Sequence, residues 1–164
     1  MTTNKSCFGI SSITHDNKHI VVIDSDIDHC EIGKFFSMCK MMQHDFKLST
    51  MYIIKSEHGF NAFTLDKIEL EFLTNMLYNY DIIDELFIYF NDNRGYYTLR
   101  WGSDKELCMI ICSQYNIHEK SNAHRLLFNH VLDIPIKKDI YFDNLSLFEI
   151  IAYENEKHGW ANLW

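Results

Sequence analysis

Apolar residues recur along the chain with two different periods, which together predict a mixture of strands and helices. Short apolar runs between polar turns indicate strands, whereas apolar residues at steps of three and four indicate helices. The predicted strands cover residues 8–13, 19–23, 50–56, 85–90, 95–102 and 107–113, with a further short one at 139–144. The predicted helices cover residues 32–42, 65–77, 123–131 and 145–153.

Capping and turn residues set the expected ends of these elements. Asp28, followed by Glu31 three residues later, is typical of a capping box at the start of the first helix. Thr64 is the expected cap of the second helix, and "NDNR" (Asn91 to Arg94) is the expected turn of a hairpin. In the third helix the pattern predicts an apolar face that faces the core, made of Ala123, Leu126, Leu127, His130 and Val131.

The order of these elements predicts an α+β fold, with helices packed against a largely antiparallel sheet. A chain of 164 residues with an apolar fraction of 47% is long enough to bury one core. The chain has one proline, six glycines and no break in composition, so we expect a single domain over residues 1–164. Its core is predicted at about 8–113, followed by a helical extension.

Composition and charge indicate the expected cellular location of the protein and how strongly it could bind membranes or nucleic acid. The five cysteines form no CxxC pair, and no apolar stretch is long enough to span a bilayer. We therefore expect a cytoplasmic protein without membrane association. The formal net charge is −8, whereas proteins that bind DNA non-specifically usually carry a basic surface. Any binding of single-stranded nucleic acid is therefore expected to be weak and local.

Two carboxylates at the end of an apolar run are the first candidate site. Asp24 and Asp26 follow the run Ile20 to Ile23, and residues two apart on a strand point the same way. Two adjacent carboxylates repel each other unless a cation lies between them, and Mg²⁺ or Mn²⁺ prefers such oxygen ligands. The alternative is that a strand simply ends in solvated aspartates, with Asp28 acting only as a cap.

The next predicted strand carries a second polar segment. "MYIIKSEHGFNAF" (Met51 to Phe63) is an apolar run that continues into Ser56, His58 and Asn61. The order of a strand with DxD, a helix, and a strand with S-x-x-G-aromatic resembles the archaeo-eukaryotic primase superfamily, which includes small primase-polymerases of plasmids and viruses. "RGYYTLRWGSDK" (Arg94 to Lys105) is similar to a later segment of such proteins. The resemblance covers about residues 19–106.

The resemblance implies a ferredoxin- or RRM-like core and metal-dependent nucleotidyl transfer in DNA replication. Asp24 and Asp26 would hold the catalytic Mg²⁺ or Mn²⁺, and the loop with Ser56, His58 and Asn61 would contact a nucleoside triphosphate. The chain departs from the family at Asn61, where the family has a histidine, so transfer is expected to be weak or absent. A third acidic ligand is not assigned, and its candidates are Asp92, Asp104, Glu106 and Asp143.

Arg100 and Lys105 are the basic residues that could contact phosphates, although both could be ordinary surface cations. Tyr89, Tyr96, Tyr97 and Trp101 could stack on bases or pack across strands. The alternative function is a non-catalytic, acidic binding or regulatory module that works through a protein partner. A phosphatase of the haloacid dehalogenase type also has DxD after a strand, but no later GDxxxD-like motif follows here. Template binding by so small a chain would also require a partner.

Overall fold

Two antiparallel sheets form the framework of the computed structural model, which describes residues 7–132. The main sheet has the strand order β2-β4-β3-β6, and the smaller sheet pairs β1 with β5. The strands are β1 (Cys7–Ser11), β2 (His19–Ser25), β3 (Met51–Lys55), β4 (Phe60–Ile68), β5 (Thr98–Gly102) and β6 (Glu106–Ile111). This arrangement of strands and helices confirms the predicted α+β class, with antiparallel sheets.

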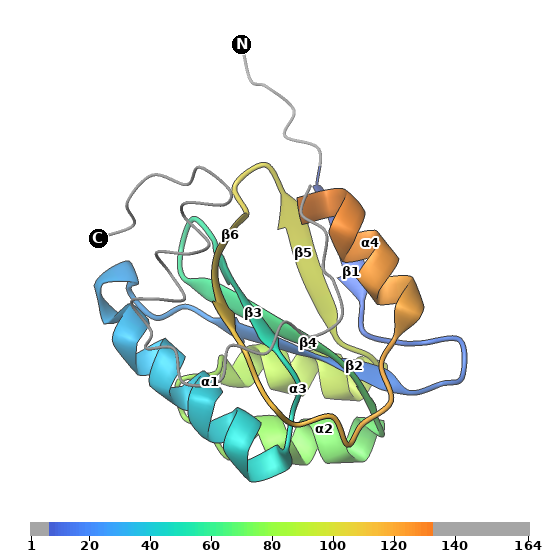
Figure 1. Cartoon of the computed structure of the whole chain (residues 1–164). Coiled ribbons are helices and arrows are strands. Elements are labelled where there is room, and N and C mark those ends of the chain that lie inside the picture. Colours follow the sequence, from blue (N-terminus) through green and yellow to red (C-terminus); the bar gives the residue numbers. More distant parts are fainter. Residues whose placement is uncertain (1–6, 133–164) are drawn as a thin grey trace.

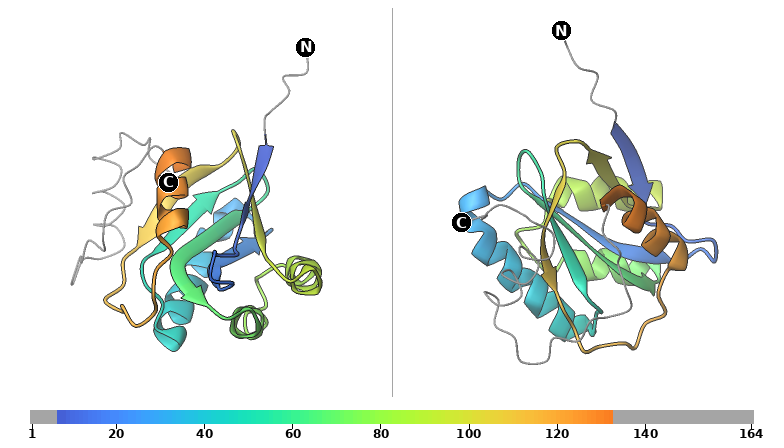
Figure 2. Two further views of the ribbon diagram at one scale, coloured as in Figure 1. Left: turned by 90° about the vertical axis from the view of Figure 1, so that its right-hand side faces the viewer. Right: turned by 45° about the horizontal axis from the view of Figure 1, so that its top comes forward.

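The helices cover both sides of the main sheet (Figure 1). They are the 3-10 helix η1 (His29–Glu31), α1 (Ile32–Phe46), α2 (Leu70–Leu77), α3 (Glu85–Arg94) and α4 (Asn122–Leu132). Phe35 of α1 stacks on Phe60 of β4, whereas Phe128 of α4 stacks on Phe63. Residues 60 and 63 of one strand point to opposite faces, so α1 and α4 pack on opposite sides of the sheet. Figure 2 shows α2 and α3 side by side, away from α4.

The central strand β4 decides how the main sheet is oriented. Both β2 and β3 pair with β4 in the antiparallel sense, so β2 and β3 are parallel to each other and end at the same edge. All nine residues of β4 are buried, because the strand has neighbours on both sides and helices on both faces. The helix α1 lies between β2 and β3 in the chain and forms the crossover that connects these two parallel strands.

The first half of the helix predicted at 65–77 is wrong. Residues 60–68 form strand β4, and the helix begins only at Leu70, so Thr64 lies buried inside a strand. A strand buried on both faces carries apolar residues at every spacing, and Leu65 and Ile68 therefore matched a helical period by coincidence. The second half, α2, does bury Leu73, Met76 and Leu77 as predicted.

The hairpin predicted around residues 91–94 is also wrong, because residues 85–94 form helix α3. The side chain of Asp84 accepts a hydrogen bond from the backbone N–H of Leu86 at 3.0 Å and caps the helix. Gly95, with φ of 86°, ends it in the left-handed conformation that glycine adopts without strain. The continuous apolar run "LFIYF" is typical of a strand, but in the structure it lies within a helix that begins after Asp84 and ends at Gly95. The second half of the predicted hairpin is strand β5.

Two details of the other helices differ from expectation. Asp28 accepts a hydrogen bond from Cys30 N and so caps η1, whereas α1 begins after Glu31 without a side-chain cap. In α4 the buried residues are His124 and Phe128, and the predicted apolar face with Leu126 and His130 is exposed. The face prediction failed because Phe128 fits between Phe63 and Trp101, a tertiary contact that the sequence period does not encode.

The strand predicted at 139–144 and the helix predicted at 145–153 lie outside the described residues. Among residues 7–132, no helix is both long enough and apolar enough to cross a membrane. In the same part of the chain Cys30, Cys39, Cys108 and Cys112 are free thiols.

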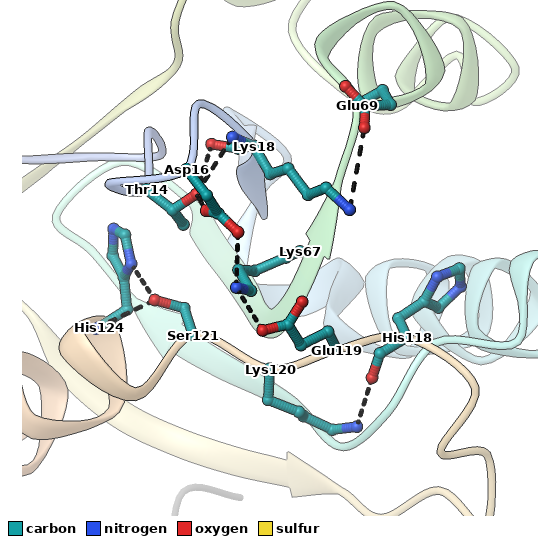
Figure 3. A network of polar contacts seen from close by, with 10 residues as sticks. All are labelled: Thr14, Asp16, Lys18, Lys67, Glu69, His118, Glu119, Lys120, Ser121 and His124. Atoms are coloured by element: carbon teal, nitrogen blue, oxygen red, sulfur yellow. Dashed lines mark hydrogen bonds and ion pairs between the residues drawn. The ribbon is translucent and has the colours of Figure 1, made fainter.

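An ion-pair network covers the edge of the main sheet at which β4 ends (Figure 3). The ammonium group of Lys67 lies 2.8 Å from Asp16 Oδ2 and 2.6 Å from Glu119 Oε1. Beside it, Asp66 Oδ2 accepts hydrogen bonds from the backbone N–H and the hydroxyl of Ser49, at 2.7 and 2.9 Å. The other oxygen, Asp66 Oδ1, has no hydrogen bond but lies 3.6 Å from the ammonium group of Lys120. Each of these charged side chains therefore has a partner of opposite charge, and we call this edge the closed end of the sheet.

Candidate functional site

The opposite edge of the main sheet, where β2 and β3 end, carries the polar residues singled out from the sequence. We call this edge the open end. Asp24 of β2 is the ladder partner of Asn61 of β4, and Asn61 is in turn the partner of Ile54 of β3. The loop of residues 56–59 between β3 and β4 therefore lies beside the aspartates.

Gly59 makes this close packing of the loop possible. A Cβ atom at Gly59 would lie 2.1 Å from the backbone oxygen of Ser25, a distance that no side chain tolerates. The backbone N–H of Ser56 donates to the oxygen of Gly59 at 3.0 Å and closes the turn. The glycine of the S-x-x-G segment is thus required because the end of β2 passes directly against the loop.

One pocket of about 160 Å³ gathers residues from four segments at the open end. It contains every residue that the sequence analysis assigned to the candidate site: Asp24, Asp26, Ser56, His58, Asn61, Arg100 and Lys105. Glu57, Thr98, Leu99 and Asp104 complete the lining. Asp24, the second-to-last residue of β2, is half-buried, and Asp26 is exposed just beyond the strand. The chain fold therefore brings together residues that are up to 81 positions apart, from Asp24 to Lys105.

A hydrogen-bonded chain joins three of these residues. The ammonium group of Lys105 donates to Asn61 Oδ1, and the Asn61 amide donates to Asp24 Oδ1. Asn61 is only 2% exposed, so its amide is committed to these two partners. It orients the Asp24 carboxylate from the strand beside it, a role that the sequence analysis did not predict for this residue.

The electrostatic environment makes the ionised form of Asp24 unfavourable. Burial raises the pKa of Asp24, and the nearby charge of Asp26 raises it further. Lys105 and the hydrogen bond from Asn61 lower the pKa, but they do not reverse the shift. A cation placed between Asp24 and Asp26 would relieve this strain, because an opposite charge stabilises the ionised carboxylates.

Among the four candidates for a third acid, Asp104 is the one that lines the same pocket. Its Oδ2 atom is buried and has no hydrogen-bond partner. Asp92 instead accepts a hydrogen bond from Thr74 at 2.9 Å, Glu106 faces Lys55 across the β3–β6 ladder, and Asp143 lies outside the described residues. Within residues 7–132, however, no three His, Cys, Asp or Glu side chains are grouped closely enough to hold a metal ion.

The cationic and aromatic candidates differ in whether their side chains are exposed or buried. Arg100 is exposed on β5 beside the pocket, where its strand neighbours Leu99 and Trp101 point into the core. His58 is also exposed, and its Nε2 atom lies 4.0 Å from Glu57 Oε1. Trp101, together with Tyr97, is buried and therefore packs in the core and cannot stack on bases.

One contributor at the open end was missed by the sequence analysis. His29 donates from Nε2 to the backbone oxygen of Ser56 at 2.8 Å, and its ring meets the edge of Phe60. It thereby ties η1 to the loop beside the aspartates. No sequence signal marked His29, because its partners lie 27 and 31 positions away and meet it only in the folded chain.

Comparison with known proteins adds no assignment to this geometry. No family model, no curated protein and no solved structure matches the chain. Function is therefore inferred from the residues of the pocket and from their sequence motifs.

Proposed function

We propose that this chain is a small primase-polymerase-like protein that transfers nucleotides with Mg²⁺ or Mn²⁺ at the open-end pocket. The observation that carries the proposal is the convergence of Asp24, Asp26, the Ser56–Asn61 loop, Arg100 and Lys105 in one hollow. These residues come from segments that are far apart in the chain. Convergence of this kind favours a shared chemical task over solvated strand ends.

The donor set suits a divalent cation of the Mg²⁺ type. Such ions are commonly bound by one or two carboxylates, with substrate phosphates and water completing the shell. Asp24 and Asp26 would supply the carboxylates, and the unpartnered oxygen of Asp104 is a further acceptor in the same pocket. When bound, the metal would neutralise charge that develops on the transferred phosphoryl group.

The remaining pocket residues would bind and orient the triphosphate. Arg100 and Lys105 carry the positive charges at the pocket, and His58 adds a ring that can be protonated. The hollow of about 160 Å³ is below the ~300–1,000 Å³ of pockets that enclose a whole small molecule. It would therefore enclose the phosphate end of a nucleotide and leave the sugar and base outside.

Asn61 limits how fast this site would work. A neutral amide forms weaker bonds to a phosphate than a charged group does, and this amide is already bonded to Asp24 and Lys105. We therefore expect slow transfer by the isolated chain and nucleotide binding that is micromolar or weaker. The main contribution of Asn61 would be to hold Asp24 in position.

Metal binding can be tested by thermal unfolding with and without Mn²⁺. A ligand that binds only the folded state raises its stability by mass action, so the wild-type melting temperature should rise with Mn²⁺ concentration. The variant with Asp24→Asn and Asp26→Asn should lose this rise, whereas Glu71→Gln, on the exposed side of α2, should keep it. Equal shifts in all three proteins would remove the metal from the proposal.

Nucleotidyl transfer can be tested by extension of a primed DNA template with nucleoside triphosphates and Mn²⁺. We expect low but measurable incorporation that Asp24→Asn abolishes and Glu71→Gln leaves unchanged. Isothermal titration with a triphosphate and Mn²⁺ measures the binding step separately. Binding without incorporation would support an inactive nucleotide-binding relative.

The second candidate function is a non-catalytic module that acts through a protein partner. Asn61 and the net charge of −8 favour it, as do the exposed apolar side chains of Leu86, Tyr89 and Phe90 on α3. Absence of triphosphate binding by titration would favour this module over the enzyme.

A further inference from the structure

Helix α3 carries apolar residues on its outer side as well as on its inner side. Ile88 is 2% exposed on the inner side, and Phe87 packs against Tyr97 there. On the outer side Leu86, Tyr89 and Phe90 are 62%, 55% and 64% exposed. Their spacing of three and four residues places these three side chains on one face of the helix. We call Leu86, Tyr89 and Phe90 the outer face of α3.

This outer face differs from the ordinary scatter of exposed apolar residues. A surface helix normally presents polar residues to water, and a helix that is apolar all round is normally covered on both sides. Three large apolar side chains together on one helix face form a contiguous patch, which is typical of an interaction surface. Tyr89 and Phe90 already contact each other edge to face, with ring centroids 5.5 Å apart.

An acidic groove begins where α3 begins. The groove has a volume of about 420 Å³ and lies between the start of α1 and the segment that leads into α3. Ile82 and Ile83 form part of its floor. Five carboxylates line the groove: Asp26, Glu31, Asp81, Asp84 and Glu85. Lys34, which is paired with Glu31, is the one cation in its lining.

The negative charge of the groove makes some binding partners of the outer face more favourable than others. Glu85 directly precedes Leu86 and lies one helical turn from Tyr89, so an occupant of the outer face would meet the carboxylates. A second copy of this chain would bring two acidic rims together, and nucleic acid would bring phosphates against them. A partner with basic residues beside apolar ones would satisfy both surfaces.

We propose that the outer face of α3 and the adjoining acidic groove together bind an amphipathic, basic helix of a protein partner. The apolar side of that helix would cover Leu86 and Phe90, and its lysines or arginines would face Asp81 and Glu85. This surface is separate from the triphosphate contacts of the proposed function, so it stands whether or not the pocket transfers nucleotides. Asp26 lines both hollows, which makes the two sites neighbours.

A designed peptide provides a defined probe for this surface. The probe is an amphipathic helix of about 18 residues, with leucines at steps of three and four and lysines elsewhere. A matched peptide has glutamates in place of the lysines. We expect saturable binding of the lysine peptide to the whole chain in fluorescence anisotropy, and no binding of the glutamate peptide.

Two pairs of variants separate this surface from general attraction to an acidic protein. Leu86→Ser with Phe90→Ser should weaken binding about tenfold, as expected for loss of buried apolar anchors. Met41→Ser with Ile117→Ser removes two equally exposed apolar residues elsewhere and should leave the affinity within about twofold.

Charge is tested in the same way. Asp81→Lys with Glu85→Lys should weaken binding about tenfold, and Glu71→Lys with Glu106→Lys, with the same net charge, should have a smaller effect. Melting temperatures of all variants show that they are folded. Equal binding by all variants, or no binding by the wild type, would overturn the proposal. Sedimentation that shows a dimer lost in Leu86→Ser with Phe90→Ser would replace the partner with a second copy.

Discussion

Each end of the main sheet carries an aspartate, Asp66 on β4 at the closed end and Asp24 on β2 at the open end. The surroundings of these two carboxylates differ. At the closed end Asp66 is 1% exposed, bonded to Ser49 and 3.6 Å from the ammonium group of Lys120. At the open end Asp24 lies beside a second carboxylate, Asp26, and its pKa is raised. At the closed end the charges hold segments together, whereas at the open end Lys105 and Asn61 only partly compensate the burial of Asp24 and its repulsion by Asp26.

This difference separates a structural polar cluster from a candidate functional one. Buried charges that only stabilise a fold are normally paired, because an unpaired charge in a poorly solvated place costs free energy. Where a folded protein keeps an incompletely compensated charge in a poorly solvated place, that charge usually serves to bind a ligand or to take part in a reaction. The open end therefore remains the candidate site on physical grounds that are independent of any family resemblance.

The largest expected difference between the two ends is in stability. Asp66→Ala should lower the free energy of unfolding by about 3 kcal/mol, because Ser49 and Lys120 lose their buried partner. Asp24→Asn should leave it unchanged or raise it by up to ~1 kcal/mol, because an unfavourable charge is removed. Urea unfolding measures both, and Asp66→Asn, which keeps an acceptor oxygen, should lose less than Asp66→Ala. Similar losses in Asp66→Ala and Asp24→Asn would contradict the distinction.

The second effect concerns backbone packing at the open end. Gly59→Ala should cost about 2 kcal/mol, because the new methyl group collides with the backbone of Ser25. It should also weaken the Mn²⁺-induced rise in melting temperature by displacing the loop beside Asp24. The matched control is Gly33→Ala in α1, where a Cβ meets nothing within 4 Å. This control should gain ~0.5–1 kcal/mol from helix propensity and keep the response to Mn²⁺.

The third effect is the response of stability to pH. His19 and His124, both buried near the closed end, have pKa values lowered by burial from 6.5. Their stabilising contribution is complete above pH 6.5, and it is lost at lower pH because the unfolded chain takes up protons that the folded chain does not. We therefore expect the free energy of unfolding to fall between pH 7 and pH 5. His124→Gln should reduce this loss, and His44→Gln, on the exposed side of α1, should not.

Asp24 should respond to pH with the opposite sign. Its pKa is raised from 3.8 in the folded state, so the folded chain takes up this proton before the unfolded chain does. Its contribution to stability therefore increases as the pH falls toward 3.8. Comparison of wild type with Asp24→Asn between pH 6 and pH 4 in urea should show this gain only in the wild type. An identical pH profile in both proteins would be evidence against a perturbed Asp24.

The smallest expected effect is in nucleic-acid binding. Arg100 and Lys105 line the open-end pocket and are the cations proposed to meet phosphates, whereas Lys67 and Lys120 lie at the closed end beside carboxylates. The affinity for single-stranded DNA should then fall with salt at a slope of about 1.4, which corresponds to two phosphate contacts. Arg100→Gln should reduce the slope by about 0.7. A slope several times larger would indicate a basic surface that lies outside this pocket.

Much of the architecture could be predicted from local patterns. The run His19 to Ile23 and the run "TMYIIK" are strands, and the period of Phe35, Cys39 and Met42 is a helix with those residues buried. These segments have one dominant period each. Predictions failed where both faces of an element are apolar, as in β4 and α3, because the period then no longer identifies the element. The caps Asp84 and Gly95 were the local signal that could have identified α3.

The sequence alone determined the chemical content of the candidate site, because a carboxylate pair after an apolar strand and a polar glycine loop after the next one are local features. Only the tertiary structure decided how those groups are used. The pairing of β4 between β2 and β3 bonds Asn61 to Asp24, and the pairing of β6 with β3 brings Lys105 and Asp104 into the same pocket from the turn before β6. Within the described part of the chain, the fold also leaves Leu86, Tyr89 and Phe90 of α3 exposed. Burial and pairing depend on contacts between segments, and these contacts exist only once the chain has folded.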